Sequence, residues 1–299
     1  MTAAETSTAA VRDLSGDRLT EEVLARFADG PSPRLSEVLQ AMVRHLHAFA
    51  REVQLTEDEW AAAVEFLTRT GHTCSDTRQE FILLSDVLGL SMQVIGINHP
   101  ASGGSTESTV FGPFYVDQAP VYRNGDDLAN GALGEPCLIS GTVRSTDGKP
   151  LAALLEVWQA DSEGLYDVQR PELGGSAQGR GDLRAEEDGR FWFWTVRPEP
   201  YPIPQDGPVG QLMHATARSP YRPAHVHFRV SMPGYETVTT HVFAAGDAYL
   251  DKDAVFGVKE SLITNFERHA AGRAPDGTTQ ARPYHTMSYD FALAPSGRR

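Results

Sequence analysis

Two histidines separated by a single residue carry the clearest chemical signal in this sequence. His225 and His227 lie in a stretch from Ala224 to Ser231 in which apolar and polar residues alternate. This alternation predicts a half-buried β-strand, on which both imidazoles project from the same face. Imidazole is the commonest metal ligand among side chains, so the pair predicts a metal site. Two ordinary histidines on a polar strand face are the alternative at this point.

Three more side chains with suitable chemistry stand close to expected strands. Tyr166 follows a strand expected at residues 154–159, and Arg222 lies just ahead of the two histidines. Tyr201 lies in the proline-rich segment 198–204, where the prolines restrict the backbone and fix the direction of the side chain. A single tyrosine is more often a half-buried aromatic residue with a solvated hydroxyl than a ligand. These residues alone predict a metal site on a β-domain and leave the metal undefined.

The composition argues against several classes of function. The chain has 299 residues, enough for one large domain or two ordinary ones. Its net charge of −14 argues against nucleic acid or an anionic membrane surface as the main partner, since both need a basic face. Cys74 and Cys137 form no C-x-x-C pattern, so no disulfide framework or thiolate zinc site is expected. Because residues 1–6 do not resemble a signal peptide and no apolar stretch approaches membrane-spanning length, we expect a soluble, cytoplasmic protein.

The first third of the chain has helical periodicity, from about residue 19 to residue 97. Ser32-Pro33 and the capping box at residues 56–59 predict two helix starts, and a further helix is expected from Asp76 to Ile95. One helix carries an apolar stripe formed by Leu35, Val38, Leu39, Met42, Val43 and Leu46. Such an amphipathic array needs a partner surface, which is either the rest of the chain or a second subunit. We expect residues 1–105 to form a helical dimerisation domain.

Beyond a turn-rich boundary at residues 99–104, the chain is expected to be rich in β-strands. The expected strands span residues 138–143, 154–159, 190–196, 224–231, 237–244 and 288–293. Short alternating strands without intervening helices predict an antiparallel β-sandwich or barrel, which we take as a β-sandwich domain that carries the metal site, over residues 106–299. The glycine-rich segment 173–181 and the proline-rich segment 201–210 are expected to be long loops. The predicted fold is therefore mainly β with an N-terminal α-helical domain.

The sequence resembles the intradiol ring-cleavage dioxygenases in four segments, which are Glu156–Asp161 followed by Tyr166, Asp188–Phe191, Tyr201–Pro204 and Arg222–Phe228. These are non-haem ferric enzymes that open catechols between the two carbons bearing hydroxyl groups. The resemblance covers most of the chain, including the helices that form a dimerisation domain in the catechol-type branch. It implies one Fe(III) per subunit, held by Tyr166, Tyr201, His225 and His227. Phenolates suit this ion because they are hard anionic donors that offset part of its charge.

The resemblance also implies roles for two residues in the reaction with O2. Tyr201 matches a tyrosine that leaves the metal when a catechol-like substrate binds and then accepts one of its protons, so it serves as a base. Arg222 matches an arginine whose fixed positive charge favours the ketonised form of the bound substrate. The alternative role of Arg222 is a salt-bridged residue at the end of a strand.

Several residues are expected to line the substrate pocket because they match pocket residues of the family. They are Leu83, Asp86, Val110, Phe111, Gly112, Pro113, Phe114, Ile203, Pro204, Arg222 and His241. Asp86 and Leu83 match the branch that acts on hydroxyquinol (benzene-1,2,4-triol), and His241 stands where catechol enzymes typically carry glutamine. By pattern alone, Asp86 is expected to face solvent. By resemblance, its carboxylate accepts a hydrogen bond from the third hydroxyl of the substrate.

The resulting hypothesis is the cleavage of hydroxyquinol with O2 to 3-hydroxy-cis,cis-muconate (maleylacetate) during the degradation of aromatic compounds. The alternative within enzymes is catechol or chlorocatechol 1,2-cleavage on the same iron site. Outside enzymes, the alternative is a binding module, a carrier or adhesion-type β-sandwich in which the His-x-His pair holds a zinc ion or no metal at all. The resemblance further implies a homodimer with lipid bound at the helical interface, and we expect neither nucleic acid nor membrane as a partner.

Overall fold

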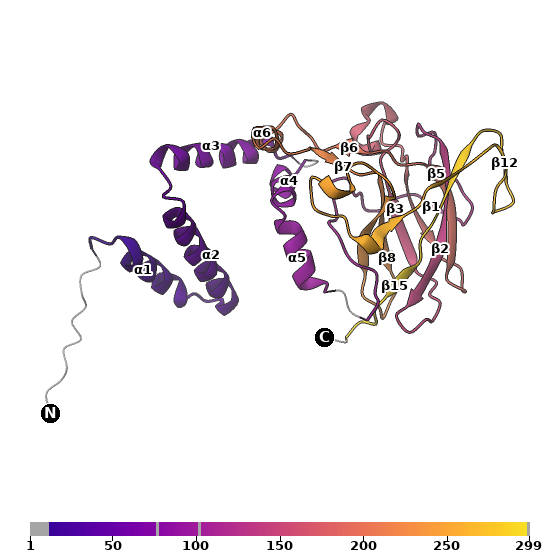
Figure 1. Cartoon of the computed structure of the whole chain (residues 1–299). Coiled ribbons are helices and arrows are strands. Elements are labelled where there is room, and N and C mark those ends of the chain that lie inside the picture. Colours follow the sequence, from indigo (N-terminus) through magenta and orange to yellow (C-terminus); the bar gives the residue numbers. More distant parts are fainter. Residues whose placement is uncertain (1–11, 76–77, 101–102, 298–299) are drawn as a thin grey trace. The chain divides into compact units, whose positions relative to one another are not determined.

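The structure is a computed structural model that describes residues 12–75, 78–100 and 103–297 (Figure 1). Three expectations fall wholly or partly outside these residues: the N-terminal segment 1–6, the helix start at Asp76, and residues 101 and 102 of the turn-rich boundary. Contacts divide the chain into two compact units, residues 1–68 and 69–299. The functional division expected between residues 105 and 106 stays a prediction.

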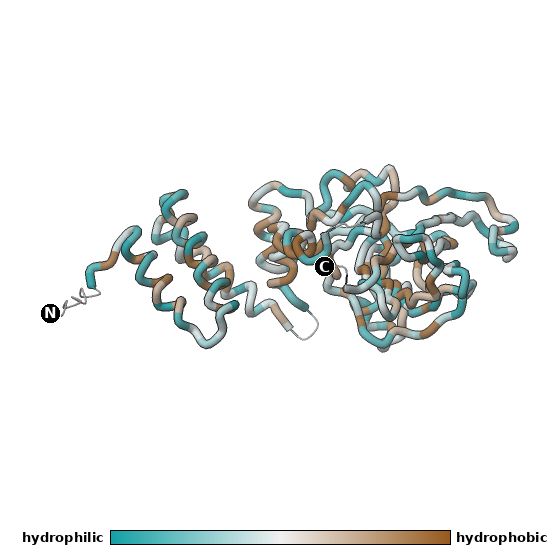
Figure 2. The backbone as a smooth tube through the Cα atoms, turned by 90° about the horizontal axis from the view of Figure 1, so that it is seen from below, coloured by the Kyte–Doolittle hydropathy of each residue, from teal (hydrophilic) through white to brown (hydrophobic). Residues whose placement is uncertain are grey.

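The first unit is helical. It holds α1 (Gly16–Ala28), α2 (Pro33–Glu52) and most of α3 (Glu57–Thr73). The expected cap of α2 is confirmed, because the Ser32 side chain accepts a hydrogen bond from the Leu35 amide and Pro33 occupies the first turn. The capping box of α3 is also confirmed, with Thr56 and Glu59 bonding each other's amides at 2.9 and 3.2 Å. In Figure 2 these helices alternate between hydrophilic and hydrophobic colours, as amphipathic helices do.

Three short helices belong to the second unit, namely α4 (Glu80–Val87), α5 (Leu90–Asn98) and α6 (Pro208–Ala215). The single helix expected from Asp76 to Ile95 is wrong: α4 and α5 are bent by 80° at a break where Gly89 adopts a φ of +73°. The start of α6 lies inside a segment expected to be a loop. Within the described residues, no single helix is long and apolar enough to cross a membrane; only the bent pair of α4 and α5, taken together, meets the requirements of length and composition.

The strands of the second unit form two main sheets. The six-stranded sheet has the order β1 (Val121–Tyr122), β4 (Arg180–Arg184), β3 (Leu154–Trp158), β8 (His225–Ser231), β9 (Val238–Ala244) and β10 (Ile263–Thr264). The five-stranded sheet has the order β11 (Glu267–His269), β14 (Tyr284–Ser288), β2 (Pro136–Ser145) and β15 (Phe291–Leu293), with β5 (Arg190–Val196) also paired to β2. Two small sheets pair β6 (Tyr201–Pro202) with β7 (Tyr221–Arg222) and β12 (Gly272–Arg273) with β13 (Thr279–Gln280).

The expectation of purely antiparallel sheets is wrong, because both main sheets are mixed. In the first sheet, β1 runs parallel to β4 and β10 runs parallel to β9. In the second, β14 and β15 both run parallel to β2. Each of these parallel neighbours is joined to its partner by a long segment of chain rather than by a tight turn, and a long connection permits a parallel return.

The single strand expected at residues 288–293 is divided into β14 and β15 by a short interruption at residues 289 and 290. Here the side chain of Asp290 accepts hydrogen bonds from the Thr142 amide and hydroxyl, both at 2.8 Å, in place of a backbone carbonyl. A Cβ at Gly141 would lie 1.8 Å from the Tyr289 carbonyl oxygen, so only glycine fits opposite the interruption.

The two main sheets pack face to face around one apolar core. The core includes Ile139, Val143, Leu155, Val157, Phe193, Val226, Phe228, Val230 and Val242. Along β8, the residues that enter this core are Val226, Phe228 and Val230, so the intervening histidines must project from the opposite face of the sheet. The β-sandwich is confirmed, and it directs the His-x-His pair away from its core.

Candidate metal centre

Strand β8 places both histidines on one face of the six-stranded sheet, between β3 and β9. The strand expected at residues 224–231 is therefore confirmed. The histidine face is not half-buried as expected, because His225 and His227 are each only 1% exposed. The ring of Trp158, opposite His227 on β3, stacks on the His227 imidazole with centroids 4.7 Å apart. Neighbouring strands and loops thus enclose both imidazoles.

The two tyrosines reach the histidines from separate segments. Tyr166 caps a short 3₁₀ helix, Asp167–Gln169, and its backbone amide donates to the Gln169 side chain at 3.0 Å. Tyr201 begins β6, where it lies opposite Arg222 of β7. A Cβ at Gly164 would lie 2.6 Å from the Tyr201 Cβ, and Gly164 has a φ of +76°. Glycine at this position therefore lets the loop that carries Tyr166 approach Tyr201 closely.

Four donor atoms converge on one small region. Tyr166 Oη lies 3.0 Å from Tyr201 Oη and 2.9 Å from His227 Nε2. The two Nε2 atoms of His225 and His227 are 3.2 Å apart, and Tyr201 Oη is 3.4 Å from His225 Nε2. Ligand atoms that bind one ion at about 2.0–2.2 Å lie roughly 3 Å from one another. The spacing of these four atoms therefore fits a single ion.

The protonation of the site suits a cation. Burial raises the pKa of Tyr166 well above its ordinary value, and it also raises the pKa of Tyr201, where the nearby Arg222 opposes it. Burial and the charge of Arg222 lower the pKa of His225 far below its usual range, and burial does the same to His227. Neutral imidazoles are ready to bind a metal, whereas both phenols need a bound cation to ionise them.

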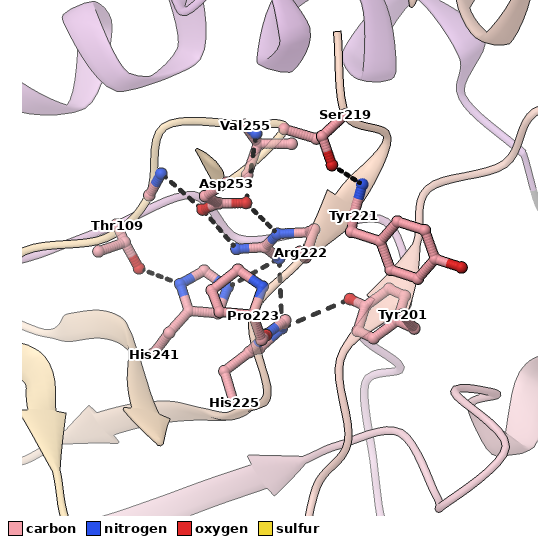
Figure 3. A network of polar contacts seen from close by, with 12 residues as sticks. Thr109, Tyr201, Ser219, Tyr221, Arg222, Pro223, His225, His241, Asp253 and Val255 are labelled. Atoms are coloured by element: carbon pink, nitrogen blue, oxygen red, sulfur yellow. Dashed lines mark hydrogen bonds and ion pairs between the residues drawn. The ribbon is translucent and has the colours of Figure 1, made fainter. Parts of the chain in front are cut away.

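Hydrogen bonds fix the tautomers of two histidines. His225 Nδ1 lies 2.7 Å from the Pro223 carbonyl, which only accepts, so Nδ1 carries the proton and Nε2 is free to bind an ion. His241 Nε2 lies 3.4 Å from Arg222 Nη1, which only donates, so the His241 proton is on Nδ1 and points to the Thr109 hydroxyl (Figure 3).

His241 is the third histidine of this cluster, and the ligand nitrogens of all three lie within 4.8 Å of one another. A set of three histidines is therefore an alternative ligand set. We favour the two tyrosines over His241, because Tyr166 Oη lies 2.9 Å from His227 Nε2 and an ionised phenol offsets part of the charge of a bound cation, which a third neutral imidazole does not.

Two adjoining cavities show how a substrate would reach the site. An outer cavity of about 820 Å³ and an inner one of about 20 Å³ share walls formed by Leu83, Pro113, Phe114, Tyr201 and Pro204. Tyr201 borders both cavities, whereas Tyr166 is fully buried beneath Phe114, whose ring stacks on it at 4.5 Å. Tyr201 is therefore the phenol that an entering molecule meets first.

Most of the expected pocket residues lie together around the inner cavity. Those that line it are Leu83, Asp86, Val110, Gly112, Pro113, Phe114, Ile203, Pro204 and Arg222. Phe111 lies outside this lining, is 40% exposed and packs on Tyr115, while His241 lies behind Arg222. Asp86 is buried, so the expectation from pattern that it faces solvent is wrong; loops far away in sequence cover that side of α4.

Several residues that support the site carry no local signal in the sequence. Val255 lines the inner cavity. Arg180 donates to Asp167 at 2.8 Å and to the Phe114 carbonyl at 2.8 Å, and so fixes both the Tyr166 loop and the ring that covers Tyr166. Arg180 belongs to β4, which begins inside the glycine-rich segment expected to be a loop. These contacts join segments that are distant in the chain, so periodicity cannot indicate them.

A β-sandwich that carries a buried pair of phenols and a pair of imidazoles, next to a cavity with an arginine, fits the class of metal-dependent enzymes. Residues 110–295 match the family model described as "Dioxygenase", and residues 32–106 match "Catechol dioxygenase N terminus". The chain is 54% identical to the 6-chlorohydroxyquinol 1,2-dioxygenase of Cupriavidus pinatubonensis (93% of this chain, 97% of the relative) and 51% identical to the hydroxyquinol 1,2-dioxygenase of Nocardioides simplex (93% and 95%).

A crystal structure of hydroxyquinol 1,2-dioxygenase from Pseudomonas putida is similar, with a TM-score of 0.86, 43% identity, and coverage of 93% of this chain and 98% of that one. The protein belongs to the intradiol ring-cleavage dioxygenases, and it is an enzyme rather than a binding module. Membership of this family implies a non-haem iron, and the buried phenol and imidazole donors fit that metal.

Proposed function

We propose that this enzyme cleaves benzene-1,2,4-triol (hydroxyquinol) between its two adjacent hydroxyl-bearing carbons, so that both atoms of O2 enter the product 3-hydroxymuconate. The observation that carries the choice of substrate is a buried carboxyl group, Asp86, in the wall of the inner cavity that also holds Tyr201 and Arg222. The names of the similar enzymes of Cupriavidus and Nocardioides support the same choice.

The proposed cofactor is one Fe(III) per subunit, held by Tyr166, Tyr201, His225 and His227. Two phenolates are hard anionic donors and suit a hard trivalent ion, whereas zinc favours nitrogen and thiolate ligands. An iron ion held by these residues would supply a Lewis acid that makes a bound diol reactive to O2.

The residues around the inner cavity perform the remaining tasks. Tyr201 Oη accepts a proton from one substrate hydroxyl, because it borders both cavities and lies next to the other donor atoms. Arg222 presents Nη1 to the same region, where its fixed charge stabilises negative charge that develops on the substrate. Phe114, Ile203 and Pro204 flank the ring and exclude water.

Asp86 supplies the recognition of the third hydroxyl. Burial raises the pKa of this carboxyl group, while a hydrogen bond from Ser91 and the charge of Arg222 oppose the rise. In either protonation state a carboxyl oxygen accepts a hydrogen bond from a phenolic hydroxyl. With catechol, which lacks this hydroxyl, the buried carboxyl group would keep Ser91 but lack the additional hydrogen bond, and an unmet buried hydrogen-bonding site costs affinity.

Substrate selectivity tests this proposal. We expect a kcat/KM for the triol that is at least about 10²-fold higher than that for catechol, because the site contains a buried hydrogen-bonding group for the third hydroxyl. The substitution Asp86→Ala should lower kcat/KM for the triol by about 10- to 100-fold and change that for catechol by less than about threefold. The measurement is oxygen uptake with both diols at several concentrations.

Glu80→Gln is the matched control. Glu80 is another buried carboxylate on α4, and it accepts hydrogen bonds from Arg78 and from the Val209 amide at the start of α6. This variant should lower the melting temperature without changing the ratio between the two substrates. A wild-type preference for catechol would contradict the proposal, as would equal losses on both substrates in Asp86→Ala.

We infer that two subunits pair through the N-terminal helices, with lipid bound at the apolar interface. One face of α2 exposes five apolar side chains at helical spacing, each between 45% and 55% exposed: Leu35, Val38, Met42, Leu46 and Phe49. The inward face holds Ser36 and Val43. An exposed apolar stripe of this length needs a covering surface, and a second copy of the same stripe supplies one.

The oligomeric state should respond to a charge in the middle of this stripe. The wild type is expected to have twice the chain mass of 32.6 kDa in light scattering coupled to size exclusion, and Leu46→Arg should shift it to the monomer. Arg44→Glu, on the opposite face of α2, is the control and should stay dimeric. Mass spectrometry of an organic extract would detect the lipid. A monomeric wild type would contradict the inferred pairing.

A further inference from the structure

Arg222 is a buried cation whose two edges face different partners. Its Nε donates to Asp253 Oδ1 at 3.1 Å, and its Nη2 lies 3.5 Å from Asp253 Oδ2. Its Nη1 points the other way, 3.2 Å from His225 Nε2 and 3.4 Å from His241 Nε2 (Figure 3). A guanidinium is a rigid plane with its donors in a fixed fork. The partner that holds the Nε edge therefore decides where Nη1 points.

Asp253 is itself held by the loop that carries it. The Gly257 amide donates to Oδ2 at 2.9 Å, and the Val255 amide donates to Oδ1 at 3.3 Å. Both carboxylate oxygens thus bind one backbone amide and face one guanidinium nitrogen, so the carboxylate cannot turn without losing hydrogen bonds. Figure 3 shows Asp253 between the loop and the guanidinium, on the side of Arg222 away from His225.

Gly257 closes the space behind this ion pair. A Cβ placed there would lie 3.2 Å from Asp253 Oδ2 and 3.3 Å from Arg222 Nη2. The backbone of the loop therefore lies directly against the pair. The φ angle of Gly257 is not positive, so alanine can occupy the position without backbone strain. The site thus offers a way to displace the guanidinium without removing a charge.

We propose that Asp253 is the positioning residue of Arg222, which directs Nη1 into the reaction site and keeps it there during turnover. This inference rests on the proposed role of Arg222 in ring cleavage. Without Asp253, the guanidinium is free to rotate about its side-chain torsions toward other acceptors. A displacement of about 1 Å in a group that stabilises the transition state can cost about 10²-fold in rate.

A purely structural ion pair is the explanation to be excluded. Breaking a buried pair destabilises a protein strongly, but this destabilisation is separate from the chemistry that Arg222 performs. If Asp253 acts only on stability, its loss should reduce turnover equally whether or not Arg222 is present. If it acts through Arg222, its loss should have no further effect once Arg222 is gone.

A double-mutant cycle separates the two explanations. We expect Asp253→Asn to lower kcat by about 10²-fold and Arg222→Gln by about 10²- to 10³-fold, with the double variant within about twofold of Arg222→Gln. The substrate is whichever diol the wild type turns over best, so failure of the triol assignment does not affect the result. If the loss of kcat in the double variant equals the product of the two single losses, the positioning role of Asp253 is overturned and the proposed function of Arg222 stands. Unchanged turnover in Arg222→Gln overturns both that role and the proposed function of Arg222.

Gly257→Ala keeps both charges and provides a second test. Its methyl group should displace the guanidinium and lower kcat about tenfold. The dissociation constant of the triol, measured by absorption titration without O2, should change by less than about threefold in this variant, because the cavity wall is intact.

Asp276→Asn is the control for the loss of a partly buried carboxylate elsewhere. Asp276 accepts a hydrogen bond from Trp194 Nε1 at 2.7 Å, outside the residues that line the two cavities. This variant should lower the melting temperature and leave kcat unchanged. A wild-type kcat in Gly257→Ala, or a loss of kcat in Asp276→Asn as large as that in Asp253→Asn, overturns the positioning role.

Discussion

Replacing Tyr166 with phenylalanine is expected to release the iron and abolish turnover. The substitution removes one oxygen from a fully buried ring whose Oη lies 2.9 Å from His227 Nε2 and 3.0 Å from Tyr201 Oη. Loss of a group that merely supports a ligand already costs about 10- to 100-fold in metal affinity, so loss of the ligand itself should lower turnover by about 10³-fold or more. The measurements are the iron content of the purified variant, its visible absorption and its oxygen uptake.

The buried environment gives Tyr166 this large effect. Phe114 stacks on the ring and Arg180 bonds to Asp167 in the loop that carries Tyr166, so the hydroxyl is held among the other donor atoms. Burial in the absence of an ion keeps the pKa of Tyr166 high, so the wild-type phenol ionises only when a cation binds it. A ferric ion bound by a phenolate should give the wild type a charge-transfer band in the visible, and this band should weaken in the variant together with the iron content.

Tyr115→Phe is the matched control for this experiment. Tyr115 packs against the same aromatic cluster and contacts the ring of Trp158. Its hydroxyl donates to Glu156 and does not take part in the group of four donor atoms. The control should keep its iron and its colour. Full iron occupancy and unchanged absorption in Tyr166→Phe would contradict the assignment of this residue as a ligand and would favour the alternative set of three histidines.

The parts of the fold that the sequence predicts are those with a local cause. The strand that carries His225 and His227 follows from alternation over eight residues, and the start of α2 follows from a cap and a proline. Strand direction has no such signal. That β14 and β15 run parallel to β2 depends on where the chain returns after more than a hundred residues, and no residue of either strand encodes this.

The same limit explains what was missed around the site. Asp86 has the pattern of a solvent-facing residue because it is a carboxylate in an otherwise apolar helix. Residues 110–114 and 201–204, which line the same inner cavity, come from distant parts of the chain. The Asp253–Arg222 pair joins residues 31 positions apart, and neither neighbourhood marks the contact. The resemblance to a family identified the donor residues one by one, whereas the residues that hold them in place required the three-dimensional arrangement.

Replacing Tyr201 with phenylalanine is expected to have a different result from the same change at Tyr166. The two hydroxyls are 3.0 Å apart, but only Tyr201 borders both cavities, so it is the phenol that an arriving diol can displace. The iron should stay bound to the remaining three donors. The kcat should fall by about 10²- to 10⁴-fold, because a positioned base for the substrate proton is lost.

The pH dependence should reveal the missing base. In the proposed mechanism Tyr201 accepts the proton within the site, so wild-type turnover should depend little on the supply of base from solvent. In Tyr201→Phe the substrate hydroxyl must lose its proton to a base from solvent instead. The residual rate should therefore rise with pH, as the supply of that base increases.

Tyr221→Phe provides the control for the small sheet that carries Tyr201. Tyr221 lies opposite Pro202 in that sheet and stacks on Tyr249 at 4.6 Å, so its ring supports the same backbone without lining either cavity. This control should keep the wild-type rate and pH profile. Loss of iron in Tyr201→Phe would show that both phenols are structural ligands, and an unchanged pH profile with reduced kcat would show that the proton goes elsewhere. Either result would contradict the proposal that the buried Tyr166 holds the iron while Tyr201, which borders the cavities, is displaced and accepts the proton.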